Sequence, residues 1–409
     1  MGDLSLDGQS SPGKTARGAA DNGVPLFAQY VAFGAQGVDV RAALPIMKKG
    51  ATQSRSVGWG WTERPGVEDY VRLGYAPNNA ASQGGHGLQG ASETLEWSID
   101  DFAIARLAES VGDHTTADAY AKRGNNWQNI YDPSTGYLRP RDDNGAFPAG
   151  PGFQTPPAGA FGQDGYDEGN AAQYNWSVQQ DMAGLIAAMG GKDTVVPRLD
   201  DFFSRLNAGG NDPYDWAGNE IDTTAPWAYD YVGQPWKTQE VTRRFETELF
   251  STAPDGLPGN DDNGALSSEY VWAALGMMPA TPGTPTLALN SPLFKRAVIS
   301  LGTGRKITVD APRAADDAPY VTGLRLDGRP RESTALPASV VTRGGALDFS
   351  LSTRPDTPAP LPAKGSHPRW RRHHGRRALV ARREPRPRYG ITPHRVSSVP
   401  AHELSEGAA

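Results

Sequence analysis

Apolar residues recur at every fourth position in one long stretch of this chain, and this spacing constrains the fold more than any other feature. The stretch carries them at Leu95, Ile99, Ala103, Leu107 and Val111. Such spacing lines one face of an α-helix with apolar side chains. Ser92 precedes the stretch, two glutamates fall in its first turn and a glycine follows it, which are the usual signals for a helix start and end. The sequence therefore predicts a helix that begins near residue 92 and ends before residue 112.

A second helical pattern follows immediately, over residues 117–131. So short a link predicts that the two helices are antiparallel neighbours. Further helices are predicted over residues 171–189, 193–206, 237–250 and 265–275, with Asp193 as the N-cap of its helix and Pro197 tolerated in an early turn. We count about eight helices in hairpins, with no alternation of strand and helix. This pattern predicts a mainly α fold.

The pattern of apolar and polar residues changes after Pro279. Segments that alternate apolar and polar residues lie between turn residues, which is typical of short antiparallel strands; they read TLALN, RAVISL, KITVDA, VTGLRLDG and ALDFSLS. The sequence thus predicts a disordered start over residues 1–21 and a helical domain over 22–284. A small antiparallel β region over 285–354 and a basic disordered tail over 355–409 follow.

Composition excludes several kinds of site. The 409 residues include no cysteine, which rules out disulfides, thiolate metal sites and cysteine nucleophiles. Five of the seven histidines lie after residue 363, and only His86 and His114 remain in the body of the chain. Any metal in the body is therefore expected to have oxygen ligands. No apolar run is long enough to cross a bilayer, and residues 1–21 show no signal-peptide pattern, so no membrane partner is expected.

The tail is strongly basic. From Lys364 onward it holds eleven Lys and Arg residues and three Glu residues. One interpretation is binding to nucleic acid or another anionic surface. The other is a solvated tail without a packed face. We favour the solvated tail and expect no nucleic-acid partner.

Three loops combine carboxylates with glycines, amides and aromatic residues, each just before a predicted helix. They read DEGNAAQYNW (residues 167–176), GNEIDTTAPW (218–227) and PDGLPGNDDNG (254–264). Loops at the starts of helices gather at one end of a helical toroid, so the three could meet at one site. Carbohydrate sites need this mixture, because aromatic faces cover the C–H surfaces of sugars while carboxylates and amides bind hydroxyl groups. Trp176 and Trp227 are candidates for such stacking, although each could instead pack in the core.

Hydrolysis of a glycoside needs one protonated carboxyl group and one ionised carboxylate. The acid needs a raised pKa, and hence a partly desolvated setting. Glu168, beside aromatic residues, suits the acid. Asp261 and Asp262, among asparagines, suit the second role. Adjacent aspartates beside a glycine also occur in calcium loops and helix caps, and this alternative stays open.

Four segments together resemble the signatures of the family 92 glycoside hydrolases. They read ASETLEWSIDDFAIARLAESVG, EGNAAQYNW with DMAGLIAAMGG, GQPWKTQEVTRRF, and PDGLPGNDDNGALSSEYVWAALGMMPATPG. The resemblance extends from about Val24 to about Ser352. It implies an exo-acting α-mannosidase with inversion at the anomeric carbon, a calcium ion at the sugar, and a partial (α/α)6 toroid.

The resemblance also implies roles for particular residues. Glu168 would be the general acid and Asp262 the base that activates water, with Asp261 or Asn260 assisting. Glu220 would contact both sugar and Ca2+. The residues expected to bind substrate are Asn260, Glu220, Asn219, Trp176 and Trp227. The implied partner is a mannose-containing glycan, with N-glycan degradation, an α-1,2 linkage and secretion or periplasmic location as further expectations.

The chain departs from the family pattern in two ways. Gln180 stands where the family usually has a histidine, and Thr223 and Thr224 lie where it usually has a histidine pair; both changes put the linkage specificity in doubt. The family also carries an N-terminal β-sandwich and a complete toroid. We therefore expect the sandwich and the first helix pairs to be missing, the C-terminal strands to expose an apolar face, and the activity of this chain to be reduced.

Three other functions are compatible with parts of the sequence. A polysaccharide lyase would need a Tyr and His pair near Arg, and the two histidines of the body lie outside the acidic loops. An inactive remnant would bind mannose without turnover. An interaction protein would rest on the basic tail alone.

Overall fold

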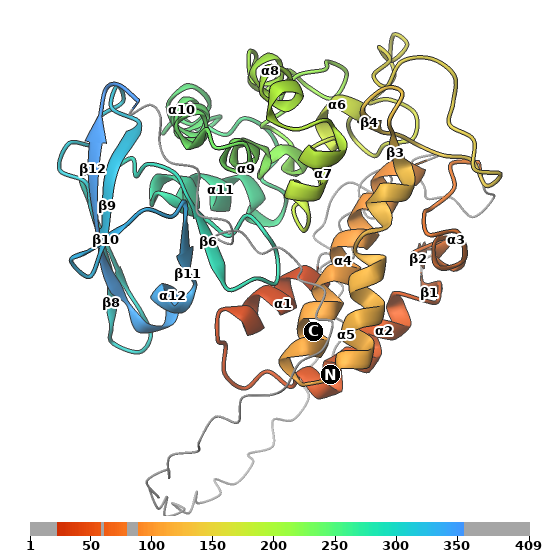
Figure 1. Cartoon of the computed structure of the whole chain (residues 1–409), viewed down its shortest axis with the longest axis horizontal. Helices are drawn as coiled ribbons and strands as arrows, with labels where there is room; N and C mark the ends of the chain where they lie inside the picture. Colours follow the sequence, from red (N-terminus) through yellow and green to blue (C-terminus); the bar gives the residue numbers. More distant parts are fainter. Residues whose placement is uncertain (1–22, 59–60, 80–88, 356–409) are drawn as a thin grey trace, which may run out of the picture. The chain divides into compact units, whose positions relative to one another are not determined.

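The computed structural model describes residues 23–58, 61–79 and 89–355, which are mainly helical with a small sheet region (Figure 1). All of them belong to one compact unit, Met1–Arg369. The predictions for residues 1–21, for His86 and for the basic tail from residue 356 onward fall on residues outside the described ranges. Within those ranges, no helix combines the length and apolarity needed to cross a bilayer.

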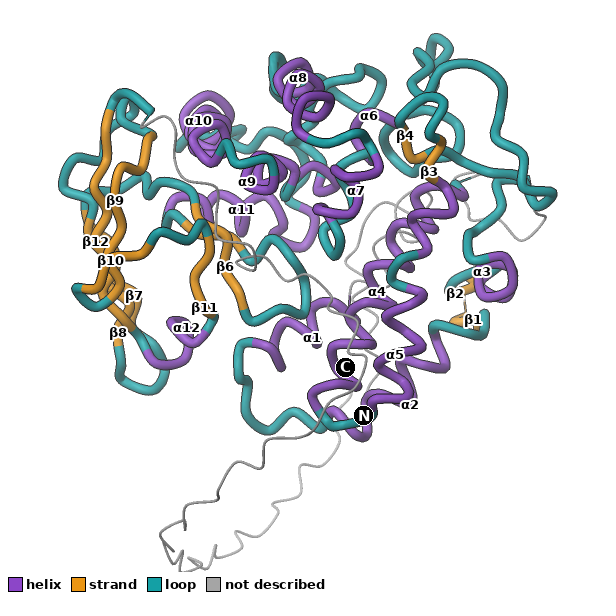
Figure 2. The backbone as a smooth tube through the Cα atoms, viewed as in Figure 1, coloured by secondary structure: helices purple, strands orange, loops and turns teal. Residues whose placement is uncertain are grey.

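The predicted antiparallel pair near residue 112 is present as α4 (Gly90–Ser110) and α5 (His114–Arg123) (Figure 2). Asp113 caps α5 by accepting a hydrogen bond from the Thr116 amide at 3.1 Å. Helices α1 (Gly23–Ala32) and α2 (Val40–Gly50) also pack against α4. Helix α4 is consequently buried around most of its circumference, so the single apolar face predicted for it was too narrow.

Helix α4 carries two aspartates that are buried, and each of them pairs with an arginine. Asp100 pairs with Arg64, and Asp101 accepts hydrogen bonds from Arg123 and from the Tyr70 hydroxyl, both at 2.8 Å. Burial raises the pKa of Asp101 to about 6, an effect that the two arginines oppose. Arginine pairing thus offsets the cost of desolvating these carboxylates.

The segment predicted as one helix over residues 171–189 contains two. They are α6 (Ala171–Tyr174) and α7 (Met182–Ala188), and Asp181 caps the second by accepting from the Gly184 amide at 3.1 Å. A capping aspartate favours a helix start and competes with a continuous helix. Helix α8 (Lys192–Phe202) follows Gly191, which has a φ of 85°. Asp193 therefore lies in the first turn of α8, and its prediction as the N-cap was wrong.

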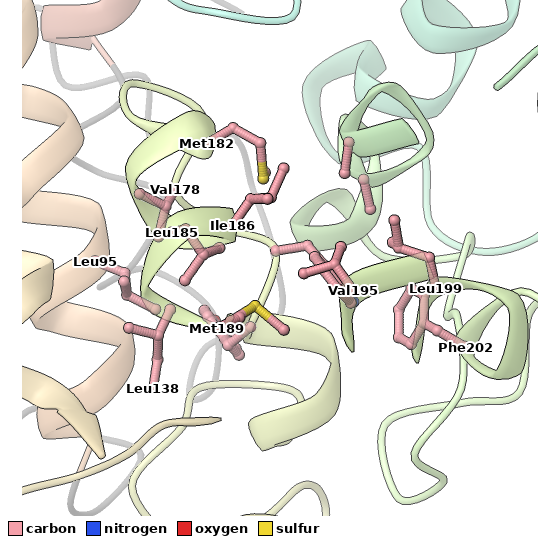
Figure 3. Packing of buried hydrophobic residues seen from close by; sticks show 14 of the residues in the cluster. Leu95, Leu138, Val178, Met182, Leu185, Ile186, Met189, Val195, Leu199 and Phe202 are labelled. Carbon is pink, nitrogen blue, oxygen red and sulfur yellow. The ribbon is translucent and has the colours of Figure 1, made fainter. Parts of the chain in front are cut away.

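The core between these helices is apolar. Figure 3 shows Ile186 of α7 and Met189, which follows that helix, on the side of Val195, Leu199 and Phe202 of α8. Helices α9 (Ala228–Tyr231) and α10 (Pro235–Arg244) belong to the same core, and a π-turn over Phe245–Leu249 extends α10. Helix α11 (Ala265–Ala274) matches its prediction to within one residue. Other short elements of the helical region include α3 (Val67–Leu73), β1 (Arg55–Gly58), β2 (Trp61–Glu63), β3 (Tyr131–Asp132) and β4 (Tyr137–Leu138).

The C-terminal strands form two sheets. The five-stranded sheet has the order β10-β9-β12-β8-β7, and the three-stranded sheet has the order β11-β6-β5. Strand β12 runs parallel to β8 and antiparallel to β9. The prediction of a purely antiparallel region was therefore wrong for one pair, because strand order depends on contacts between distant segments. The bounds are β5 (Met277–Met278), β6 (Thr286–Leu289), β7 (Arg296–Ser300), β8 (Lys306–Asp310), β9 (Tyr320–Leu326), β10 (Arg329–Arg331), β11 (Ala335–Pro337), α12 (Ser339–Arg343) and β12 (Gly345–Ser352).

The apolar face of the larger sheet is covered, contrary to our expectation. On β12, Leu347, Phe349 and Leu351 are buried while the alternating Asp348 and Ser350 are exposed. The buried residues form one core with residues of β5, β6, β11 and α12. The smaller sheet therefore supplies the cover that we had expected to be missing.

Candidate active site

Glu168 has an unusual backbone conformation. Its φ of 53° lies in the left-handed region, which is costly for a residue with a Cβ atom. The carbonyl groups of residues 167, 168 and 169 each accept a hydrogen bond from another part of the chain. The Tyr174 hydroxyl donates to the Asp167 carbonyl at 2.6 Å, and the Asn219 side chain donates to the Glu168 carbonyl at 2.9 Å. The main-chain N–H of Gln163 donates to the Gly169 carbonyl at 2.7 Å. Strain that persists because its surroundings hold it in place is typical of functional sites.

The residues after Glu168 are packed too closely for larger side chains. A Cβ atom on Gly169 would lie 2.8 Å from Ile221, and one on Gly162 would lie 2.6 Å from the Gly169 carbonyl. Asn170 caps α6 and donates to the carbonyls of Gly210 and Asp212 at 3.0 and 2.9 Å. The glycine and amides of this motif therefore hold the loop in place.

The second acidic loop touches the first through Asn219. This residue was predicted to bind substrate, but its amide donates to the Glu168 carbonyl and its side-chain oxygen accepts from the Glu220 amide at 3.0 Å. Both interactions are with the protein backbone. Glu220 opens a short 3-10 turn, Glu220–Asp222, and is partly buried.

The third acidic loop lies against the second. A side chain at Gly259 would collide with the Gly218 carbonyl, so the two backbones are in close contact. Asn207 joins the same loops, because its amide donates to the Pro258 carbonyl and accepts from the Gly218 amide, both at 2.9 Å. The three loops therefore lie together, as the sequence predicted. Nothing in the sequence identified Asn207, which follows the end of α8 in a left-handed conformation.

The two adjacent aspartates of the third loop differ in their surroundings. Asp261 accepts from the Ser267 amide at 2.7 Å and from its hydroxyl at 2.6 Å, so both of its oxygens serve the start of α11. Asp262 is exposed to solvent, as is Asn260. This arrangement makes Asp261 a residue that positions the loop and leaves the Asp262 carboxylate facing water.

The carboxyl groups of the three loops influence one another. Burial raises the pKa of Glu168 to about 7, with further upward contributions from Asp167, Glu220 and Asp262. Burial, together with Glu220, raises the pKa of Asp167 to about 7. The pKa of Glu220 is also raised, by burial and by Asp262. A carboxyl group with such a pKa keeps its proton near neutrality, which a general acid requires.

The two tryptophans predicted to stack on sugar lie in the core. Trp176 is 1% exposed and packs against Phe202 with ring centroids 6.1 Å apart. Trp227 is 2% exposed. A sugar cannot reach either ring, so both substrate-binding predictions were wrong. The sequence pattern alone could not distinguish an exposed tryptophan in an acidic loop from a buried one.

A second group of carboxyl groups is buried at the second loop. Asp215, Asp222 and Glu269 are all buried, and burial raises the pKa of Asp222 to about 7 and that of Glu269 to about 8. We did not predict this buried group from the sequence, because acidic residues are equally common in exposed loops.

Oxygen donors for a metal are present at the site. Glu220, in the second loop, is the predicted ligand. The side-chain amide of Asn260 belongs to the third loop, which contacts the second. In the described ranges, however, no group of three or more His, Cys, Asp or Glu side chains is arranged to hold a metal ion. A calcium ion at Glu220 would therefore need carbonyl, amide or water ligands, which calcium commonly takes.

Comparison with known proteins places these loops in a family. The model of the glycosyl hydrolase family 92 catalytic domain matches residues 5–353. The chain belongs to glycoside hydrolase family 92. The resemblance inferred from the motifs is thereby confirmed, and it weighs against a polysaccharide lyase.

The relatives include solved structures of family 92 mannosidases and a curated glycosidase sequence. A family 92 α-mannosidase from Bacteroides thetaiotaomicron has 27% identity and a TM-score of 0.74, and the match covers 85% of this chain and 44% of the relative. A family 92 inverting mannosidase from the same organism has 32% identity and a TM-score of 0.72, over 82% of this chain and 46% of the relative. An uncharacterized secreted glycosidase from Arthroderma benhamiae is 26% identical over 72% of this chain and 40% of its own length. The chain thus spans less than half the length of each of these relatives.

Proposed function

We propose that this family 92 chain hydrolyses terminal α-linked mannose. Its relatives include proteins named as α-mannosidases, one of them in complex with mannoimidazole. The observation that carries the proposal is the setting of Glu168, a strained residue whose flanking carbonyl groups accept hydrogen bonds from the side chains of Tyr174 and Asn219 and whose pKa burial raises to about 7. A proton donor to a glycosidic oxygen needs such a setting.

In the proposed mechanism the two carboxyl groups have different roles. Glu168 gives its proton to the departing oxygen, while Asp262, exposed to solvent, takes a proton from the attacking water. Asp261 fixes the start of α11 and thereby the backbone that carries Asp262. Water attacks on the face opposite the leaving group, which inverts the anomeric carbon. The carboxyl groups of such a pair are about 6.5–9.5 Å apart.

A calcium ion fits this function in part. Glu220 would hold it, with oxygen donors from amides, carbonyls or water completing the ligands. When bound, such an ion would polarise mannose hydroxyl groups. Its positive charge would offset the negative charge of Glu220, which contributes to the raised pKa of Glu168.

Four further properties belong to the same proposal. The helical hairpins would form part of an (α/α)6 toroid. The substrate would be a mannose-containing glycan, with α-1,2 linkages the first to test, and the process would be N-glycan degradation. Secretion is proposed because the fungal relative is named as a secreted glycosidase.

The experiment is an α-mannosidase assay of the purified chain with 4-nitrophenyl α-mannoside and with α-1,2-mannobiose. Each is run with added calcium and with a chelator. Release of mannose that depends on calcium supports the proposal. Binding of mannose without any turnover would instead indicate a carbohydrate-binding protein and would contradict it.

A further inference from the structure

We propose that Phe161 forms an apolar wall for the leaving group, the sugar that departs when Glu168 gives up its proton. This inference rests on the proposed mannosidase function. It assigns a binding surface to a residue outside all three acidic loops.

Phe161 is unusually exposed for a residue in an ordered turn. Its side chain is 65% exposed, and its ring meets the edge of Trp216 with centroids 5.8 Å apart in a T-shaped arrangement. Single exposed apolar residues are common and need no function. Phe161 differs from such residues in how its backbone is held and in where it lies.

The backbone on both sides of Phe161 is held by one amide side chain. Asn211 donates to the Ala160 carbonyl at 2.9 Å and accepts from the Gly162 amide at 2.7 Å. The ring therefore projects from a turn whose conformation is defined. An aromatic side chain held this way loses little conformational entropy when it binds a ligand.

The turn lies directly beside the proposed acid. Gly162 is in close contact with Gly169, and the next residue, Gln163, donates its amide hydrogen to the Gly169 carbonyl at 2.7 Å. Trp216, the partner of Phe161, lies three residues before Asn219, whose side chain holds the Glu168 carbonyl. The aromatic pair is thus attached to the Glu168 loop through two separate segments.

This position corresponds to the leaving-group side of the reaction. A general acid must come within hydrogen-bond distance of the glycosidic oxygen. The departing sugar is bonded to that oxygen, so it must pass close to the Glu168 loop. An exposed phenyl ring there can cover the C–H face of a pyranose. The tryptophans first considered for this role are buried and cannot.

The test compares two substrates that differ only in the leaving group. α-1,2-Mannobiose has a departing sugar, whereas α-mannosyl fluoride has none. Phe161→Ala should lower kcat/KM for mannobiose by about 10-fold, the effect of one aromatic contact, and change that for the fluoride by less than about 2-fold. Phe161→Trp should restore most of the activity on mannobiose. Phe294→Ala is the matched control, because Phe294 is similarly exposed, at 50%, but precedes β7.

Equal losses on both substrates, or no loss on mannobiose, would overturn the assignment of Phe161. A wild-type chain that hydrolyses neither substrate would overturn the mannosidase function. In that case calorimetry still tests Phe161: wild-type protein should bind mannobiose more tightly than methyl α-mannoside, and Phe161→Ala should remove the difference. No difference in the wild-type protein would overturn the assignment.

Discussion

The loops of Glu168 and Asp262 belong to one site but are built in different ways. In the Glu168 loop, three successive carbonyl groups each accept one hydrogen bond, from Tyr174, Asn219 and Gln163 respectively. Glu168 itself has a strained backbone and is partly buried. Around Asp262 the chain is mostly exposed, and its described anchors are Asp261 and the Asn207 bridge at Pro258. The Glu168 loop is suited to keeping a carboxyl group protonated, and the Asp262 loop is suited to taking a proton from water.

The comparison indicates where each kind of change should act. A carboxyl group that must remain protonated needs desolvation and negative neighbours, both of which cost folding free energy. A base that works on water needs neither. Substitutions near Glu168 should therefore change kcat and its pH dependence. In the third loop, a substitution of Asp262 should change kcat, whereas a substitution of Asp261 should change the stability of the fold.

Glu168→Gln should have the largest effect. Without a proton donor, kcat for mannobiose should fall by about 10³-fold or more. Activated aryl mannosides should lose much less, because their leaving groups need little protonation. Glu332→Gln, at an exposed glutamate, serves as the control. Equal losses on both kinds of substrate would remove Glu168 from the role of acid.

The adjacent aspartates provide the next comparison. Asp262→Asn should lower kcat by about 10²-fold on activated and ordinary substrates alike, because both need the water to be deprotonated. Its melting temperature should stay near that of the wild type, since Asp262 is exposed. Asp261→Ala should instead destabilise the chain by about 1–2 kcal/mol, through loss of the hydrogen bonds to Ser267. The opposite pattern, with Asp262 structural, would exchange the roles.

Asn207→Gly should lower kcat by a smaller factor, because it would let the third loop shift relative to the second. Glycine tolerates the φ of 54°, so the backbone is not strained, but the bridge between Gly218 and Pro258 is lost. We expect kcat to fall by about 10-fold, since small displacements of reacting groups are costly. Asn125→Gly, at the end of α5, is the control. Unchanged kinetics would show that the third loop keeps its position without the bridge.

The smallest expected effect is on pH dependence. Asp167 raises the pKa of Glu168, so Asp167→Asn should lower that pKa. The acid would then lose its proton at a lower pH, and the alkaline limb of kcat should move toward acidic pH. Asp164→Asn, at an exposed residue of the same segment, should leave the profile unchanged. An alkaline limb that moves the other way would show that Asp167 acts by another route.

These loops also show what the sequence could and could not predict. The mainly helical fold, the antiparallel α4 and α5, and the meeting of the three loops followed from helix spacing and from motifs before helices. Trp176 and Trp227 were misjudged because burial depends on what packs above a residue. Strand β12 was misjudged because its parallel pairing with β8 joins segments that no local pattern connects. Asn207 had no signal, since asparagine in a turn is common.

The division of labour between Glu168 and Asp262 is tested most directly by the anomer that forms first. Proton NMR can follow hydrolysis of an aryl α-mannoside by the wild-type chain before mutarotation equalises the products. We predict that β-mannose accumulates first, because water activated by Asp262 attacks opposite the leaving group that Glu168 protonates. Initial α-mannose would mean that a carboxylate attacks the sugar directly, and it would contradict the account.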